Sequence, residues 1–153
     1  MALGKHNFIA RYVAQHTAEE LGNALVYPTM PFAPTGDPVE KTKLMGFTGT
    51  INVSDETFGL VAREVALSAI SAGFKNVILM GEHGWGQDAL KRVAEELNGQ
   101  WAPKSIHVYY ILNKGQEQID EYLAKHKLTM RSGGPGSGVQ MCNFIHPLTG
   151  KSW

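Results

Sequence analysis

Cysteine is nearly absent from this chain of 153 residues, which contains only Cys142. A single thiol excludes a disulfide within the chain and any zinc site built from CxxC pairs, a usage that fits a reducing compartment. Long hydrophobic runs are missing too: none approaches the roughly 20 residues of a membrane-spanning helix, and the start has no signal-peptide pattern. We therefore expect a cytoplasmic protein with no membrane partner.

An excess of charge of either sign is also missing, because 14 basic residues balance 14 acidic ones. Domains that bind nucleic acid usually carry a basic patch, so we expect no nucleic-acid partner. The length and the 43% of hydrophobic residues suit one domain that folds without disulfides. We expect a single α/β domain over residues 1–153, with a shortened start at 1–6 and an irregular tail at 131–153.

The most informative stretch is a strand-turn-helix pattern with the sequence KNVILMGEHGWGQD. Residues 76–80 form a short, β-branched apolar run typical of a strand buried on both faces. Residues 87–98 have the spacing of an amphipathic helix that ends at Gly99. The pattern predicts a buried strand that runs through a glycine-rich turn into a surface helix.

The turn itself carries an acid and an imidazole, Glu82 and His83, with the indole of Trp85 close by. In open α/β sheets, ligands bind in the crevice at the carboxyl ends of the strands. The turn is therefore the best candidate for a functional site. Glycines such as Gly84 permit a tight turn and close approach of a ligand to the backbone, although glycines often follow strands without that role.

Helices and strands alternate along the rest of the chain. We expect helices over residues 7–21, 55–72 and 116–126, and strands over 24–27 and 105–112. Ser54 precedes two acidic residues and suits the cap of the second helix, and Gly73 suits its end. The apolar positions expected to face the core are Phe8, Ile9, Tyr12, Val13 and Leu21 in the first helix, and Phe58, Val61, Val65, Leu67, Ala69 and Ile70 in the second. We interpret His107, inside the last strand, as structural.

Residues 28–50 form a long irregular connection with four prolines and three glycines. A connection of this length inside a compact domain is usually functional or disordered. Its aromatic residues, Phe32 and Phe47, favour an ordered rim of an active site. A surface excursion held by two aromatic side chains is the equally weighted alternative.

Three motifs in order along the chain carry a resemblance to a known family. The motifs GFTGTINVSDETF, SAGFKNVILMG and EHGWGQDALKRVAEEL resemble the creatininase family of metal-dependent amidohydrolases. Its members carry a loop close to FPGTISL, then GF and a strand that ends in NGHGGN. The likeness covers residues 2–112. It implies a three-layer α/β sandwich with a mainly parallel sheet, assembly into homo-oligomers, and hydrolysis of C–N bonds in small molecules with a pair of divalent metals.

The family's metal ligands can be compared with this sequence position by position. His83 matches the ligand histidine of the NGHGGN turn, and an imidazole suits zinc or manganese. Trp85 stands where creatininases have a glutamate ligand, whereas Glu82 lies just before the histidine. The family's LPLGTD pattern matches ALGKHN, so His6 stands where an aspartate bridges the two metals. Because imidazole cannot bridge as a carboxylate does, we expect a single-metal site.

The resemblance thus implies a hydrolase of amide, cyclic amide or ester bonds that acts through a metal-activated water. Its metal would be held by His83, His6 and Glu82, completed by His146 or a neighbouring subunit. Glu82 would also act in catalysis, and Trp85, Phe47 and Gly84 would contact the substrate. The family's EqHGPH and HAGE segments are not recognisable here.

Two alternatives stay open. The chain can be an inactive, shortened relative without metal that acts in structure or oligomerisation, with His83 as a hydrogen-bonded turn residue. The turn can also bind phosphate at the start of the following helix, although it lacks the lysine and hydroxyl of a nucleotide loop.

Overall fold

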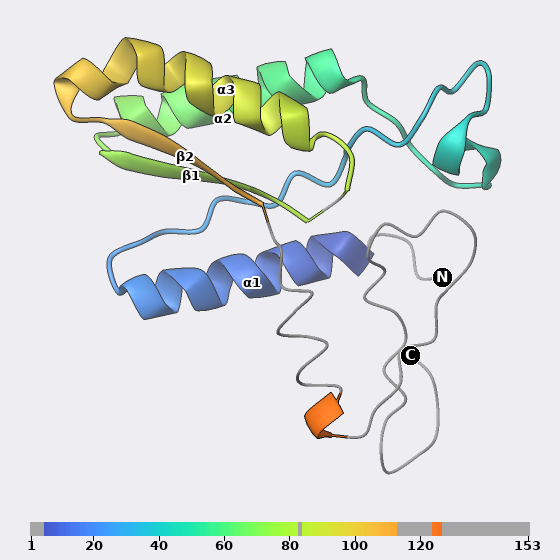
Figure 1. Ribbon diagram of the computed structural model, residues 1–153, viewed down its shortest axis with the longest axis horizontal. Helices are drawn as coiled ribbons and strands as arrows, with labels where there is room; N and C mark the ends of the chain where they lie inside the picture. The colour runs from blue at the N-terminus through green and yellow to red at the C-terminus, as the bar shows by residue number, and fades with distance from the viewer. Residues whose placement is uncertain (1–4, 83, 113–123, 127–153) are drawn as a thin grey trace. The chain divides into compact units, whose positions relative to one another are not determined.

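The computed structural model describes residues 5–82, 84–112 and 124–126 (Figure 1). The chain divides into two compact units, Met1–Asn113 and Lys114–Trp153. The described part of the first unit is α/β, with three α-helices and a two-stranded parallel sheet. Its elements are α1 (Lys5–Leu21), η1 (Lys43–Gly46), α2 (Asp55–Ser71), β1 (Asn76–Gly81), α3 (Gln87–Trp101), η2 (Ala102–Lys104) and β2 (His107–Leu112). The helix expected over 116–126 and the tail lie almost wholly outside the described residues.

The sheet consists of β1 and β2, which run parallel with Asn76 opposite His107 and Gly81 opposite Leu112. Parallel neighbours need a crossover connection, and α3 supplies it between the two strands. The predicted strand-turn-helix pattern is therefore confirmed. Both strands end at the same edge of the sheet, which leads into the glycine-rich turn.

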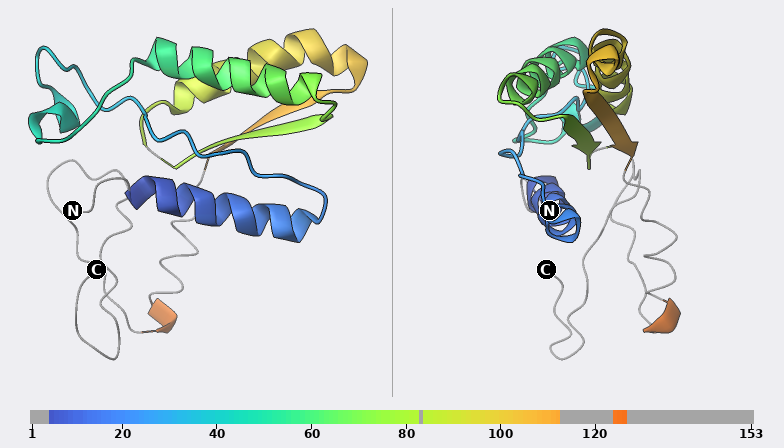
Figure 2. Two further views of the ribbon diagram at one scale, coloured as in Figure 1. Left: turned by 180° about the vertical axis from the view of Figure 1, so that it is seen from behind. Right: turned by 90° about the vertical axis from the view of Figure 1, so that its left-hand side faces the viewer.

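The core lies between the sheet and the helices α2 and α3, which pack against each other on one of its faces (Figure 2). Its larger cluster of buried side chains joins α2, α3 and β2 through Ala66, Ile70, Val93, Ala94, Leu97, Ile106 and Val108. Val77 and Leu79 of β1 pack against this cluster. The helices therefore hold β1 in place immediately before the turn.

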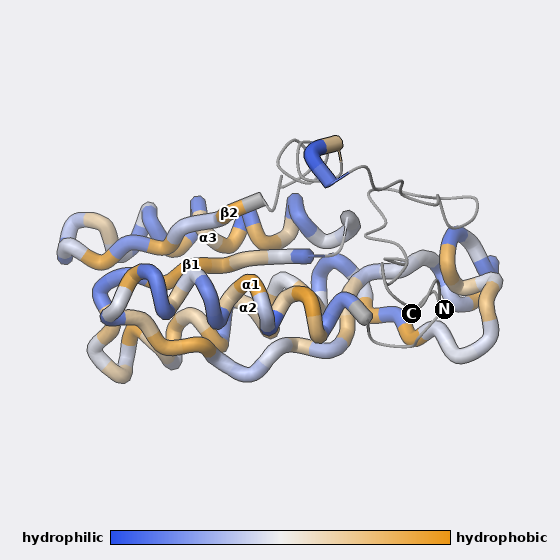
Figure 3. The backbone as a smooth tube through the Cα atoms, turned by 90° about the horizontal axis from the view of Figure 1, so that it is seen from below, coloured by the Kyte–Doolittle hydropathy of each residue, from blue (hydrophilic) through white to orange (hydrophobic). Residues whose placement is uncertain are grey.

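The expectation that residues 76–80 are buried on both faces is wrong. The strand is apolar along most of its length (Figure 3), but exposure alternates along it, and Ile78 is 39% exposed. Tyr109 and Ile111 of β2 are also exposed. Residues that alternate along a strand point to opposite faces, so α2 and α3 cover only the face of Val77 and Leu79.

Both ends of α2 form as predicted. The Ser54 side chain accepts a hydrogen bond from the Thr57 N–H at 3.0 Å, which satisfies one of the free donors of the first turn. At the other end Gly73 has a φ of +99°, and the N–H groups of Gly73 and Phe74 donate to Ile70 and Ala69. This is a Schellman motif, which favours glycine because of the positive φ.

The faces of the helices agree with the prediction only in part: Phe58, Ala69 and Ile70 of α2 are buried as expected, and Leu67 packs against the core. In α2 the side chains of Val61 and Val65 are exposed, and the alanines Ala62 and Ala66 are buried. Small residues let α2 and α3 pack closely. A Cβ added to Gly59 would lie only 3.6 Å from the Cβ of Ala89 in α3. In α1, Phe8, Tyr12 and Leu21 are exposed, whereas Ile9 and Val13 are partly buried.

One predicted strand does not form, and one helix ends later than predicted. Residues 24–27 are not a strand: Leu25 is 78% exposed, and the segment pairs with neither β1 nor β2. Apolar composition forms a strand only where partner backbone and packing are available. The third helix continues through Gly99 to Trp101, because one glycine costs a helix only about 1 kcal/mol and Trp101 packs against the core. No helix of the described residues has the length and apolarity to cross a bilayer.

Candidate functional site

The turn after β1 is closed by side chains from three elements. Gln87, the first residue of α3, donates from Nε2 to the carbonyl oxygen of Gly81 at 3.2 Å. The Tyr110 hydroxyl donates to Gln87 Oε1 at 3.1 Å. Gly86 has a φ of +84°, and a Cβ there would lie 3.0 Å from atoms of Phe58 and Pro34. These contacts fix the two ends of the segment that carries Glu82.

Burial raises the pKa of the Tyr110 hydroxyl, and the nearby carboxylate of Asp88 raises it further. Both effects disfavour the phenolate. Tyr110 is therefore a neutral donor at physiological pH, which is the form that its hydrogen bond to Gln87 requires.

The helix α1 brings a histidine to this turn. His6, in the first turn of α1, places Nδ1 3.8 Å from Oε1 of Glu82. The Glu82 side chain is only 10% exposed and that of His6 is 32% exposed. The contact of α1 with β1 produces this approach between residues far apart in the sequence. The structure therefore brings together two of the predicted site residues, an imidazole and a carboxylate.

The connection over residues 28–50 also reaches the turn. Lys43, the first residue of η1, places Nζ 5.2 Å from the centre of the Trp85 ring. Ammonium groups at such distances are attracted to the ring face. Phe47 follows η1 directly and is 59% exposed. The part of this connection that carries η1 thus lies beside the candidate site.

Polar side chains hold the connection in shape. Asn52 Oδ1 accepts from the backbone N–H groups of Thr35 at 2.7 Å and Gly36 at 3.3 Å. Asp37 Oδ1 accepts from the N–H groups of Val39 and Glu40 at 2.7 and 2.8 Å. These are side-chain-to-backbone bonds of the kind that stabilise turns. They show that this part of the connection is ordered, while Phe32 and Phe47, the two aromatic side chains expected to hold it, are both exposed.

The model of a protein family, creatininase (creatinine amidohydrolase), matches residues 1–134. The chain belongs to the creatininase family. No curated protein and no solved structure matches it. The family is one of metal-dependent amidohydrolases, and the match spans α1, the turn after β1 and every other element of the described fold.

A creatininase-family site requires metal ligands, and the described donors can be tested against that need. Two ligands at about 2.0–2.2 Å from a tetrahedral ion lie roughly 3.3–3.6 Å apart. The His6–Glu82 separation of 3.8 Å is only slightly longer, so this pair fits one edge of such a site. Imidazole nitrogen and carboxylate oxygen are both donors that zinc and manganese accept.

His83, the third candidate donor, lies outside the described residues, as does His146. Among residues 5–82, 84–112 and 124–126, no three His, Cys, Asp or Glu side chains gather closely enough to hold a metal. The described part therefore brings together two candidate donors, His6 and Glu82, and His83 is the neighbour of Glu82 in sequence.

Two other residues considered from the sequence are Gly84, which lies in the turn, and His107, which lies far from it. Gly84 is exposed in the turn, and a Cβ there would meet no atom within 4 Å, so crowding does not require a glycine. His107 begins β2 opposite Asn76, at the other end of the sheet from Glu82 and roughly 20 Å away along the strand. His107 therefore lies apart from the candidate site.

Three residues of the site were not recognised from the sequence. Lys43 reaches Trp85 through a backbone with a φ of +54°, which the sequence gives no reason to expect. Gln87 and Tyr110 bond across the turn because α3 and β2 converge there. The only available signal was the position of Gln87 immediately after the glycine-rich turn.

Proposed function

We propose that this creatininase-family protein hydrolyses an amide, cyclic amide or ester bond in a small molecule, with one divalent zinc or manganese ion. His6, Glu82 and His83 would hold that ion. The observation that carries the proposal is the 3.8 Å approach of His6 to the nearly buried Glu82 at the carboxyl end of β1.

The arrangement assigns a task to each residue. A divalent metal, when bound, would polarise the scissile carbonyl and make water a better nucleophile at neutral pH. Glu82 has a carboxylate that is almost withdrawn from solvent and can accept the proton that the attacking water loses. His6 would supply a nitrogen ligand from α1, 3.8 Å from the Glu82 carboxylate.

The rim supplies surfaces for the substrate. The half-buried ring of Trp85 offers an apolar wall beside the turn, with the Lys43 ammonium over it. This ammonium would stabilise negative charge that develops on the substrate oxygen. Phe47 and the backbone at Gly84 would complete the contacts with the substrate.

The alternative is a family member without metal that acts through assembly. One observation favours it: the second face of the sheet exposes apolar side chains. In that case the His6–Glu82 pair is a structural contact between α1 and the turn.

Hydrolysis assays separate the two functions. We expect the protein, loaded with zinc or manganese, to hydrolyse some members of a set of amides, cyclic amides and esters. His6→Ala should lower kcat/KM by about tenfold or more, because it removes a proposed ligand and even the loss of a group that only orients a ligand has an effect of that size. His107→Ala is the matched control and should leave the rate unchanged. Equal rates in the His6 and His107 variants would contradict the proposed site.

A further inference from the structure

The end of β1 lies directly against the side chain of Gln87. A Cβ added to Gly81 would lie 2.6 Å from Nε2 and 3.0 Å from Oε1 of Gln87, and 3.0 Å from Cδ1 of Leu90. Any residue other than glycine at this position would therefore force the carboxamide of Gln87 to move. The close contact indicates that the strand end and this side chain form one unit.

Two hydrogen bonds set the orientation of the Gln87 carboxamide. The carbonyl oxygen of Gly81 can only accept, so the NH₂ group must face it, at 3.2 Å. On the other side, Oε1 accepts from the hydroxyl of Tyr110 at 3.1 Å. The Tyr110 side chain packs against both clusters of the core. Through Gln87, the last carbonyl of β1 is thus tied to the core of the protein.

The bonded carbonyl belongs to the same peptide group as the backbone nitrogen of Glu82. Because a peptide group is planar, a hydrogen bond to its oxygen restrains the orientation of the whole group. That orientation sets the direction in which the chain enters Glu82, whose Oε1 lies 3.8 Å from Nδ1 of His6. The bond from Gln87 therefore bears on where the Glu82 side chain points.

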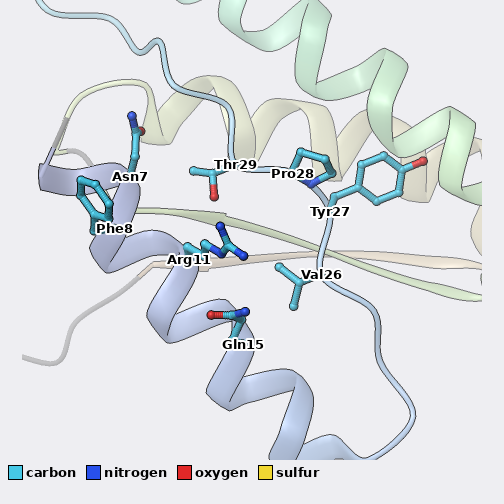
Figure 4. Close-up of a pocket in the computed structure, with 8 residues that line it drawn as sticks. All are labelled: Asn7, Phe8, Arg11, Gln15, Val26, Tyr27, Pro28 and Thr29. Carbon is cyan, nitrogen blue, oxygen red and sulfur yellow. The ribbon is translucent and has the colours of Figure 1, made fainter.

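The helix that carries His6 is held less firmly than the sheet. None of residues 6–21 of α1 is buried. In Figure 4 the side chains of Arg11 and Gln15 extend into a hollow between α1 and the extended chain that follows it. Elements with few buried contacts are the ones that move most easily. The restraint on Glu82 has to come from the sheet rather than from α1.

We infer that Gln87 is a positioning residue, which directs the Glu82 carboxylate toward His6 through its bond to the last carbonyl of β1. Tyr110 holds the carboxamide of Gln87 in the orientation that this bond requires. The direction of Glu82 is a property of the chain with or without metal. Its value for metal binding rests on the function proposed above.

Two substitutions remove the bond and keep the length of the side chain. In Gln87→Met the thioether cannot donate to Gly81 and is only a weak acceptor for Tyr110. In Gln87→Glu the carboxylate can still accept from Tyr110, but it cannot donate to the carbonyl. Both variants should therefore release the peptide group before Glu82.

Nuclear Overhauser effects between the His6 ring protons and the Glu82 methylene protons, measured on the metal-free full chain, report the direction of Glu82. We expect them in the wild type and expect both Gln87 variants to lose them. Gln100→Met makes the same change at an exposed position of the same helix and should keep them. Thermal unfolding shows that each variant is folded. The inference is overturned if the wild type lacks these effects or if either folded Gln87 variant retains them.

Zinc affinity, measured by competition with a chelator, separates this inference from the proposed function. If the wild type binds zinc, Gln87→Met should bind it about tenfold or more weakly, as is usual when a group that orients a ligand is lost. Gln100→Met should bind zinc as the wild type does. Equal affinity in Gln87→Met and the wild type overturns the inference and leaves the proposed function standing. A wild type that binds no zinc removes the proposed function, and the Overhauser effects then decide the inference alone.

Discussion

At the scale of single residues, Glu82 has the most demanding environment in the described site. Its carboxylate is nearly withdrawn from water and faces the imidazole of His6. We expect Glu82→Gln to lower kcat by about 10²- to 10⁴-fold, since a neutral amide cannot accept a proton from water. Steady-state kinetics, combined with metal analysis, measures the effect.

The metal content of the same variant distinguishes two roles. A residue that only moves a proton would leave the metal bound, whereas a ligand would lose both metal and turnover. Glu95→Gln on the exposed surface of α3 serves as the control. Full activity in Glu82→Gln would show that this carboxylate takes no part in the reaction.

Tyr110 connects the stability of the site to pH. Because burial and Asp88 raise the pKa of its hydroxyl in the folded state, the folded protein holds this proton more tightly than the unfolded chain. Its contribution to stability is fully present below the unfolded value of about 10 and is lost as pH rises through the folded pKa. Tyr110→Phe has no such proton and also lacks the hydrogen bond to Gln87.

Chemical denaturation at a series of pH values tests this coupling. Below about pH 9, we expect Tyr110→Phe to be less stable than the wild type by roughly 1 kcal/mol, the usual net value of one hydrogen bond. Above about pH 10 the difference should shrink, because only the wild type loses stability from this group. A difference that stays constant through that range would show that Tyr110 does not titrate differently in the folded state.

At the scale of elements, one side chain joins α3 to β2. Asn98 donates from Nδ2 to the carbonyl of Val108 at 2.6 Å and accepts from the Val108 N–H at 2.8 Å. Val108 is buried, so these backbone groups have no access to water. We expect Asn98→Ala to lower the free energy of unfolding by roughly 2–3 kcal/mol, because it leaves two buried polar groups unsatisfied.

Gln100→Ala is the matched control for that prediction. Gln100 lies on the exposed side of the same helix and makes one long bond of 3.4 Å to Glu96. Its loss should change stability by no more than about 0.5 kcal/mol. Equal effects of the two substitutions in denaturant titrations would mean that the Asn98 bonds add no net stability.

Elements with strong local signals could be predicted from the sequence. The cap at Ser54, the stop at Gly73 and the run before Gly81 each have a local cause, and each element forms where predicted. The faces of the helices depend on packing, which the sequence does not specify. Val61 and Val65 are exposed because Ala62 and Ala66 permit the close approach of α2 to α3.

In the candidate site, too, features with a local sequence signal could be predicted and features that depend on tertiary packing could not. The turn with Glu82 was found because it follows a strand, and His6 was placed near it through the family pattern. The contact of Lys43 with Trp85 depends on how η1 folds within a long connection, and no local signal specifies that fold. The catalytic, metal-binding and substrate-binding roles stay predictions for all the candidate residues: His6, Phe47, Glu82, His83, Gly84 and Trp85.

At the scale of the whole molecule, the second face of the sheet predicts self-association. Ile78, Tyr109 and Ile111 come from adjacent strands and are all exposed. Contiguous exposed apolar patches often mark interaction sites. We expect sedimentation at micromolar concentration to show a homo-oligomer, and Ile78→Lys to shift it toward monomer.

Val61→Lys is the control for this shift, because it places the same charge at an exposed position on α2, away from the sheet. It should leave the oligomer intact. A wild-type protein that is monomeric throughout the concentration range would contradict the prediction.

The metal content of the protein tests the central claim most directly. After purification without chelators, we expect about one zinc or manganese ion per chain. A second ion is not expected, because His6 stands where the family has the aspartate that bridges two metal ions. His83→Ala should lose that ion and keep its fold, whereas His107→Ala should retain it. A folded wild-type protein that neither retains nor takes up metal, or a His83→Ala variant with undiminished metal, would contradict the account.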